Sequence, residues 1–161
     1  MVDELSELEV DLNTEIFDEE DEDEDEDEDE LLDFDSEGKV RFMASIADSL
    51  RATNIQALDL RPLTIISDFF LICTGKSSIQ IRGIADRIEE KLRDQGLRKL
   101  RVEGYREATW ILLDYGDVVA HIMSEEQRAY YDLETFWNEA PRLKLELIEE
   151  PTLGLISDLT A

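Results

Sequence analysis

The sequence holds one cysteine and one histidine among its 161 residues, and this scarcity excludes several kinds of site. A single cysteine cannot form an intramolecular disulfide, which fits a reducing compartment. Cys73 lies in an apolar run, where a small buried hydrophobe is favoured over a nucleophile. One histidine and scattered aspartates lack the spacing of metal ligands, so we expect neither a metal site nor a cofactor.

Long hydrophobic runs are also missing, since none approaches the roughly 20 residues that a transmembrane helix needs. We therefore expect no membrane association. The first seven residues, MVDELSE, are acidic, whereas secretory and transit peptides begin with basic residues. Together these features predict a cytoplasmic protein, and they leave open an organelle stroma or matrix for a processed chain.

Basic residues are absent from the first 38 positions, which contain 22 of the 42 acidic residues. Residues 21–30 are an unbroken run of aspartate and glutamate, whose mutual repulsion opposes folding. The sequence thus predicts a disordered acidic tail over residues 1–38, with a solvating role favoured over a docking arm for basic partners. Residues 39–161 hold 20 acids and all 16 bases, and their length suits one domain.

Apolar spacing predicts an α/β domain over residues 39–140, in which one mixed five-stranded sheet carries helices packed on it. The predicted order is α-β-β-α-β-β-β-α. Its segments are a helix over 38–53, strands over 56–62 and 66–74, a helix over 77–96, strands over 97–102, 109–114 and 118–123, and a helix from 124. Residues 141–161 are predicted to form a loosely ordered extension, in which 143–147 alternate like an edge strand.

Two segments have the spacing of a capping box, in which a serine and a glutamine three residues later satisfy the first N–H groups of a helix. They are Ser77–Gln80 and Ser124–Gln127. The first overlaps a Thr-Gly-Lys-Ser segment at residues 74–77, which invites comparison with a phosphate-binding loop but lacks the upstream glycine. A tight turn followed by a helix cap is therefore favoured over an anion site.

The segment WILLDYGDVVAHIM, residues 110–123, contains the single histidine and predicts a β-hairpin turning at Tyr115-Gly116-Asp117. His121 and Asp117 would share a strand face but lie roughly 13 Å apart, too far for a direct pair. No hydroxyl or thiol nucleophile accompanies them. A structural or interface histidine is thus favoured over a catalytic one.

Aromatic residues beside charged ones are the composition of protein-binding hot spots, and Trp110, Tyr115, Tyr130 and Tyr131 fit it. Trp110 could equally lie in the core, and Trp137 is expected there. A local basic cluster spans residues 98–106, but the mildly acidic domain would repel a polyanion, so we expect little direct contact with nucleic acid.

Several segments resemble the RsfS/Iojap family of ribosomal silencing factors across about residues 39–140. They are SDFFLICTGKSS at 67–78, IADRIEEKL at 84–92, EGYRE at 103–107, WILLDYGDVVAHI at 110–122 and YDLETFW at 131–137. The resemblance implies a small α/β domain similar in fold to nucleotidyltransferases but without their catalytic residues. Family members occur in bacteria, mitochondria and chloroplasts.

The resemblance also implies a function. Such proteins bind the large ribosomal subunit through its protein fourteen, on the intersubunit face, and sterically block joining of the small subunit when nutrients are scarce. The free protein could be a homodimer. The residues that match the binding region are Trp110, Asp114, Tyr115, Gly116, Asp117 and His121, with Tyr130 and Tyr131 as neighbours. The family often has an aromatic residue where Met123 stands, so that contact is open.

Two other functional classes stay open. An Mg²⁺-dependent nucleotidyl- or phosphoryl-transfer enzyme would use Asp68, Asp114 and Asp117, which would have to converge on the metal. A generic protein-interaction domain would instead rely on its acidic tail.

Overall fold

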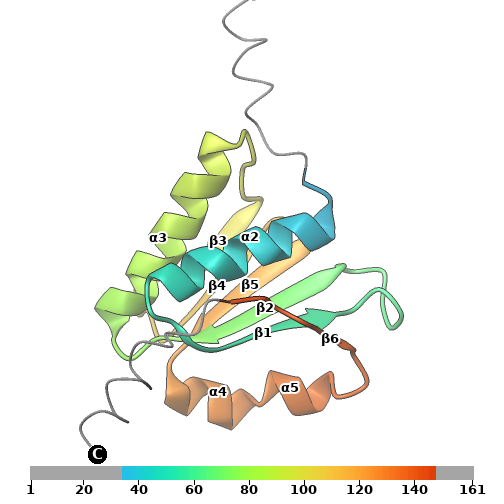
Figure 1. The fold of residues 1–161 in the computed structure, drawn as a ribbon. Coiled ribbons are helices and arrows are strands. Elements are labelled where there is room, and N and C mark those ends of the chain that lie inside the picture. The colour runs from blue at the N-terminus through green and yellow to red at the C-terminus, as the bar shows by residue number, and fades with distance from the viewer. Residues whose placement is uncertain (1–33, 148–161) are drawn as a thin grey trace, which may run out of the picture. The chain divides into compact units, whose positions relative to one another are not determined.

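A six-stranded sheet organises residues 34–147, the part of the chain that the computed structural model describes (Figure 1). Its strands are β1 (Thr53–Asp59), β2 (Phe69–Thr74), β3 (Arg101–Glu103), β4 (Trp110–Asp114), β5 (Val118–Met123) and β6 (Arg142–Leu143). They lie in the order β3-β4-β5-β2-β1-β6, with β2 parallel to β5 and the other neighbours antiparallel. The predicted α/β class is confirmed, although the sheet has six strands rather than five.

Helices cover both faces of the sheet. They are α2 (Ser36–Ser49), α3 (Ser78–Asp94), α4 (Glu125–Tyr131) and α5 (Leu133–Phe136). Figure 1 shows α2 and α3 crossing one face, which we call the first face. On the opposite, second face, α5 contributes Leu133, and Trp137 follows it. The last helix predicted from the sequence is thus two short helices, separated by Asp132 in a left-handed conformation (φ 48°).

Strand side chains alternate between two hydrophobic clusters, because successive residues point to opposite faces of a sheet. The cluster under α2 and α3 includes Phe69, Leu71, Ile111, Leu113, Val118, Ala120 and Ile122. The second face holds Leu58, Leu60, Ile72, Met123 and Ala140, with Phe70, Trp110, Leu133 and Trp137 packed against them. Since Leu112 and Asp114 stay half-exposed there, α4 and α5 leave part of the second face open.

Both predicted helix caps are present. The Ser77 hydroxyl accepts a hydrogen bond from the Gln80 N–H (3.1 Å), and the Gln80 side-chain oxygen accepts one from the Lys76 N–H (2.6 Å). At the start of α4, the Ser124 hydroxyl accepts from the Gln127 N–H (3.2 Å). The segment that resembled a phosphate-binding loop is therefore a tight turn, and its Lys76 N–H already donates to the Gln80 side chain of the helix cap.

The boundaries of the domain differ from those predicted. Helix α2 begins at Ser36 because the Asp35 side chain accepts a hydrogen bond from the Gly38 N–H (2.7 Å), so residues 35–38 belong to the domain. Residues 1–33, with the acidic run, lie outside the described residues. The third strand begins at Arg101 rather than at residue 97, because the Leu97 N–H still bonds the Leu92 carbonyl at the end of α3.

Part of the predicted loose extension is also built into the domain. Residues 142–143 form β6 on the edge of β1, and Leu145 and Leu147 pack against the larger cluster. The Arg41 guanidinium donates a hydrogen bond to the Lys144 carbonyl (2.9 Å). Residues 148–161 lie outside the described part of the chain.

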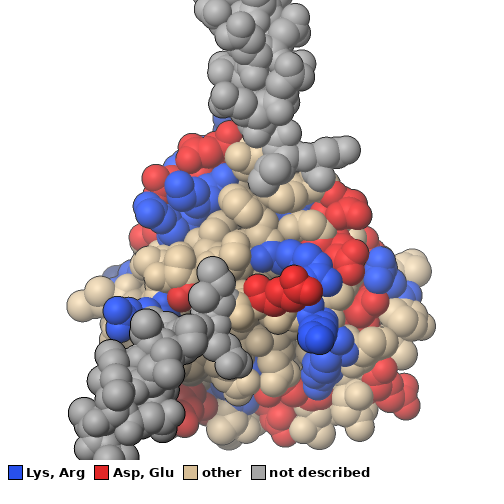
Figure 2. Space-filling model, viewed as in Figure 1, with Lys and Arg blue, Asp and Glu red and all other residues tan. Residues whose placement is uncertain are grey.

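Charges of both signs are interspersed over the first face (Figure 2). The large negative charge of the sequence therefore belongs to its first 38 residues rather than to this surface. Within residues 34–147, no helix is both long enough and apolar enough to cross a membrane.

The cap of α3 yields a stability test. Replacing Ser77 by alanine removes the acceptor of the Gln80 N–H, so Ser77→Ala should lower the free energy of unfolding by about 1 kcal/mol in chemical denaturation. Ser78→Ala is the matched control, because Ser78 is the exposed first residue of the same helix. Equal effects of the two substitutions would contradict a capping role for Ser77.

Candidate functional site

The β4–β5 hairpin places the candidate residues on the second face of the sheet. In the register of the hairpin, Leu112 lies opposite His121 and Trp110 lies opposite Met123. Met123 is 1% exposed, so the contact left open at this position is not a surface contact in this chain. Trp110 is half-buried, which resolves its alternatives: one part packs on the second cluster and the rest reaches the surface.

A continuous row of seven rings, joined by six ring contacts, crosses this face, and we call these seven residues the aromatic array. In order they are Tyr130, Tyr131, Trp110, His121, Phe70, Trp137 and Phe136, with successive ring centroids 5.0, 4.8, 5.8, 4.6, 6.0 and 5.1 Å apart. Its two ends are the most open, since Tyr130 is 80% and Phe136 74% exposed. Rings from β2, β4, β5, α4 and the α5 region thus form one surface.

Sequence reasoning identified four members of the array as surface candidates and missed Phe70, Phe136 and Trp137 in that role. One signal was available for Phe70, because it alternates with Phe69 and Leu71 of the larger core and must point to the second face. No comparable signal existed for Phe136. Its exposure follows from the break at Asp132, which sequence spacing does not reveal.

His121 is buried at the centre of the array, with 4% of its surface exposed. Its Nδ1 accepts a hydrogen bond from the Trp110 indole N–H (3.1 Å), so in the neutral ring the proton lies on Nε2, which is buried and has no hydrogen-bond partner among residues 34–147. Burial lowers the His121 pKa to about 4, although Asp114 acts in the opposite direction. The expectation that a partner touches His121 directly is corrected, because the ring is buried. His121 instead positions Trp110 through the hydrogen bond that it accepts from the indole N–H.

Tyr115 is also a core residue rather than a surface contact. It is 8% exposed and packs in the larger cluster, and burial raises its pKa to about 12. The adjacent Gly116 has φ 87°, as the turn between the strands requires. Its N–H donates to the Asp114 carboxylate (2.8 Å), which also accepts from the Arg101 guanidinium (3.1 Å). Asp114 is therefore already paired with a cation, and 18% of its side chain is exposed.

Asp117 joins three parts of the fold. The Lys39 ammonium, 78 residues earlier in the chain, donates to both oxygens of its carboxylate (2.8 and 3.0 Å). Its carbonyl accepts from the Asp68 N–H (2.8 Å), the Phe69 N–H (3.0 Å) and the Ser67 hydroxyl (2.9 Å). Only 33% of its side chain is exposed, so Asp117 mainly holds the turn in place.

The carboxylates proposed for Mg²⁺ do not form a ligand set. Asp114 pairs with Arg101 and Asp117 pairs with Lys39, whereas a metal site needs carboxylates that converge. Among residues 34–147, no group of three or more His, Cys, Asp or Glu is placed to hold a metal ion. Cys73 is fully buried and its pKa is raised to about 12 by that burial, so it is not a thiolate nucleophile.

A cavity of about 750 Å³ opens where the parallel strands β2 and β5 end, the usual ligand position in open α/β sheets. Four acidic side chains line it, against Lys76 and Arg128. Arg128 is 5% exposed and donates to the Asn54 carbonyl (2.6 Å), the Thr74 hydroxyl (2.9 Å) and Glu134 (3.1 Å). This acidic lining does not suit the phosphates of a nucleotide.

The chain is similar in sequence to known proteins. The family model described as "Ribosomal silencing factor during starvation" matches residues 33–156. A ribosomal silencing factor of Halalkalibacterium halodurans is 39% identical over 107 residues, which cover 66% of this chain and 92% of that protein. The chloroplastic protein Iojap of Zea mays is 39% identical over 106 residues, covering 64% and 45% of the two chains.

A similar fold has been solved by crystallography. An X-ray structure of a Chromobacterium violaceum protein aligns with a TM-score of 0.64 at 26% sequence identity. The alignment covers 73% of this chain and 97% of that one.

Burial of His121 predicts a pH dependence of stability. Because the folded-state pKa of about 4 lies below the ordinary 6.5, the unfolded chain takes up this proton first as the pH falls. The His121 contribution to the free energy of unfolding is therefore full above pH 6.5 and decreases by about 1.4 kcal/mol per unit down to pH 4.

The measurement is urea denaturation at several pH values, with His121→Phe as the reference. Both proteins share the titration of their carboxylates, so the difference between their slopes from pH 6.5 to 4 reports His121 alone. Parallel slopes would show that the imidazole is not buried in solution.

Proposed function

This chain belongs to the family of ribosomal silencing factors, and from that premise we propose that it represses translation by binding the large ribosomal subunit. The contact is with protein fourteen of that subunit, and the bound domain occupies the space that the small subunit needs. Repression under nutrient limitation follows from the starvation role in the family description. The ribosomes concerned lie in a bacterial cytoplasm, or in an organelle if the chain is a processed form.

The observation that carries this proposal is the aromatic array on the open part of the second face. Tyrosine and tryptophan dominate the binding energy of protein interfaces because they bury large apolar areas with few rotatable bonds. Tyr130, Tyr131 and half-buried Trp110 lie in consecutive ring contact, and β3 and the β4–β5 turn flank them with charged groups. A row of exposed rings bordered by charged groups is the composition of a protein-binding surface.

The charges beside the array suit a basic protein. Arg101 pairs with both Asp114 and Glu103, so two carboxylates border the array with one guanidinium between them. Ribosomal proteins are basic, and complementary charge favours correct orientation during encounter. The net charge of −4 over residues 39–161 opposes direct binding to ribosomal RNA.

The proposed mechanism is steric and needs no chemistry. Residues that an enzyme on this fold would use are engaged otherwise, since Asp114 and Asp117 are paired with cations and Cys73 is buried. Binding alone is sufficient to keep another subunit from the same surface.

Removing the aromatic anchors should weaken binding. Trp110→Ala is expected to raise the dissociation constant for large subunits by roughly 30-fold, which corresponds to a hot-spot loss of about 2 kcal/mol. Because Trp110 is half-buried, Tyr130→Ala provides a second variant whose side chain is 80% exposed and whose loss leaves the fold intact. The measurement is cosedimentation of each variant with large subunits, together with the yield of joined ribosomes.

Ile79→Ala is the matched control, because Ile79 is 79% exposed at the start of α3, outside the array. It should bind and inhibit subunit joining as the native chain does. Normal binding by both Trp110→Ala and Tyr130→Ala would exclude the array as the docking surface.

The acidic tail is proposed to accelerate the encounter with basic ribosomal proteins. Removing residues 1–33 deletes 20 acids while keeping the Asp35 cap of α2, so the domain stays intact. The association rate constant at low salt should fall about tenfold or more, the dissociation rate constant should stay the same, and the difference should shrink in 0.5 M salt. Stopped-flow or surface-based kinetics would measure it, and an equal association rate would remove this role from the tail.

A further inference from the structure

The loop between β1 and β2 exposes aliphatic side chains at its tip. We call residues 61–67 the β1–β2 loop. Ile65 is fully exposed (103%), Ile66 is 83% exposed and Leu63 is 39% exposed. Two adjacent isoleucines in water are unfavourable in a free protein, and contiguous exposed apolar groups often mark an interaction site.

This loop is held in one shape by its own hydrogen bonds. The Leu60 carbonyl accepts from the Leu63 N–H (2.9 Å) and from the Thr64 N–H (3.0 Å). The Ile66 N–H donates to the Thr64 hydroxyl (3.2 Å). At the base, the Leu60 N–H donates to the Asp68 carbonyl (2.8 Å). The two exposed isoleucines therefore lie on a turn that is ordered by hydrogen bonds within the loop.

The first leg of the loop is fixed further by Arg61. Its guanidinium donates to both oxygens of Asp59 (2.9 and 2.7 Å) and lies over the Phe69 ring, 4.8 Å from the centroid. Pro62 follows and restricts the backbone to one φ. A loop that is ordered before binding loses little conformational entropy when a partner covers it.

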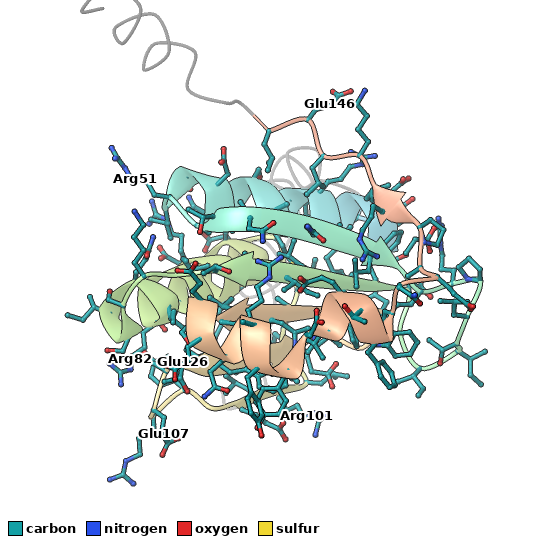
Figure 3. The ribbon with its side chains drawn as sticks, turned by 90° about the horizontal axis from the view of Figure 1, so that it is seen from below. Arg51, Arg82, Arg101, Glu107, Glu126 and Glu146 are labelled. Carbon is teal, nitrogen blue, oxygen red and sulfur yellow. The ribbon has the colours of Figure 1, made fainter. Side chains whose placement is uncertain are left out.

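The loop continues the candidate docking surface. The Ser67 hydroxyl and the Asp68 N–H both donate to the carbonyl of Asp117, in the turn of the β4–β5 hairpin. At the other leg, Leu60 lies in the hydrophobic cluster against which Trp137 packs. Figures 1 and 3 both place the β1–β2 loop beside the end of α5, where the array reaches the surface at Phe136.

We propose that the β1–β2 loop is a second contact for the protein that covers the aromatic array, with Ile65 and Ile66 entering an apolar recess of that partner. The inference rests on the proposed function and adds to it a site that the array does not contain. The rings of the array provide the contact area, whereas the protruding pair Ile65 and Ile66 fixes the position of the partner along the surface.

The test compares the double variant Ile65→Ser/Ile66→Ser with Ile79→Ser, which removes an isoleucine of similar exposure from α3. Because these side chains are about four-fifths exposed or more, all variants should unfold close to the temperature of the native chain. The dissociation constant for large ribosomal subunits should rise at least tenfold for the double variant and stay unchanged for Ile79→Ser. An unchanged constant for the double variant overturns the inference.

Failure of this inference is distinguishable from failure of the proposed function. If Trp110→Ala abolishes subunit binding while Ile65→Ser/Ile66→Ser does not alter it, the array stands and the loop contact is rejected. If the native chain does not bind large subunits, both are rejected together.

Two other occupants of the loop would give different results. A second copy of this chain would appear in sedimentation equilibrium as a dimer that the double variant converts to a monomer, with subunit binding unchanged. A lipid surface would appear as cosedimentation with phosphatidylcholine vesicles that the double variant loses. Either result, with unchanged ribosome affinity, overturns the proposed contact.

Discussion

The pairing of Lys39 with Asp117 is the constraint on which the candidate surface depends. One carboxylate holds the amino-terminal turn of α2, while the backbone carbonyl of the same residue holds the beginning of β2 and the base of the β1–β2 loop. An ion pair with little solvent around it costs desolvation, and its value lies in fixing one arrangement. Here that arrangement fixes the positions of the β4–β5 hairpin, the β1–β2 loop and α2 relative to one another. A surface that must fit another protein needs its parts held in fixed relative positions, and Asp117 is the residue that joins them.

The two faces of the sheet are covered by helices to different extents. β5 is buried along its whole length, so the centre of the sheet is apolar on both sides. The first face is closed by two long helices and carries the larger core. The second face receives two short helices that leave its β4 side open. Under the proposed function, recognition uses the part of the second face that these helices leave open, where the most exposed rings are Tyr130 and Phe136.

Much of the fold could be read from local sequence, because its causes are local. The capping boxes at Ser77 and Ser124 and the apolar run of β2 each depend on residues within one segment. The family resemblance then identified the hairpin as the candidate surface. An edge strand was expected over residues 143–147, whereas β6 pairs at Arg142–Leu143, because alternation indicates a strand but not where its pairing begins and ends.

The environment of each site residue could not be predicted in the same way. Alternation states which face His121 points to, but whether that face is covered depends on Phe70 and Trp110, which come from other strands. The same reason explains Tyr115, whose burial follows from packing in the larger cluster. Asp117 was a candidate for the binding region and for a metal site, and its pairing could not be foreseen because its cation, Lys39, is 78 residues away. Exposure is a property of assembled layers, which single segments do not encode.

The neutral imidazole beneath Trp110 has a consequence for how the protein can be controlled. A histidine that changes charge near neutral pH turns an interface into a proton sensor. Burial lowers the pKa of His121 to about 4, so the imidazole is mainly uncharged between pH 5 and 8. The indole above it therefore keeps its anchor when a cell acidifies or recovers. Under the proposed function, binding through this surface would therefore not respond to the proton concentration between pH 5 and 8.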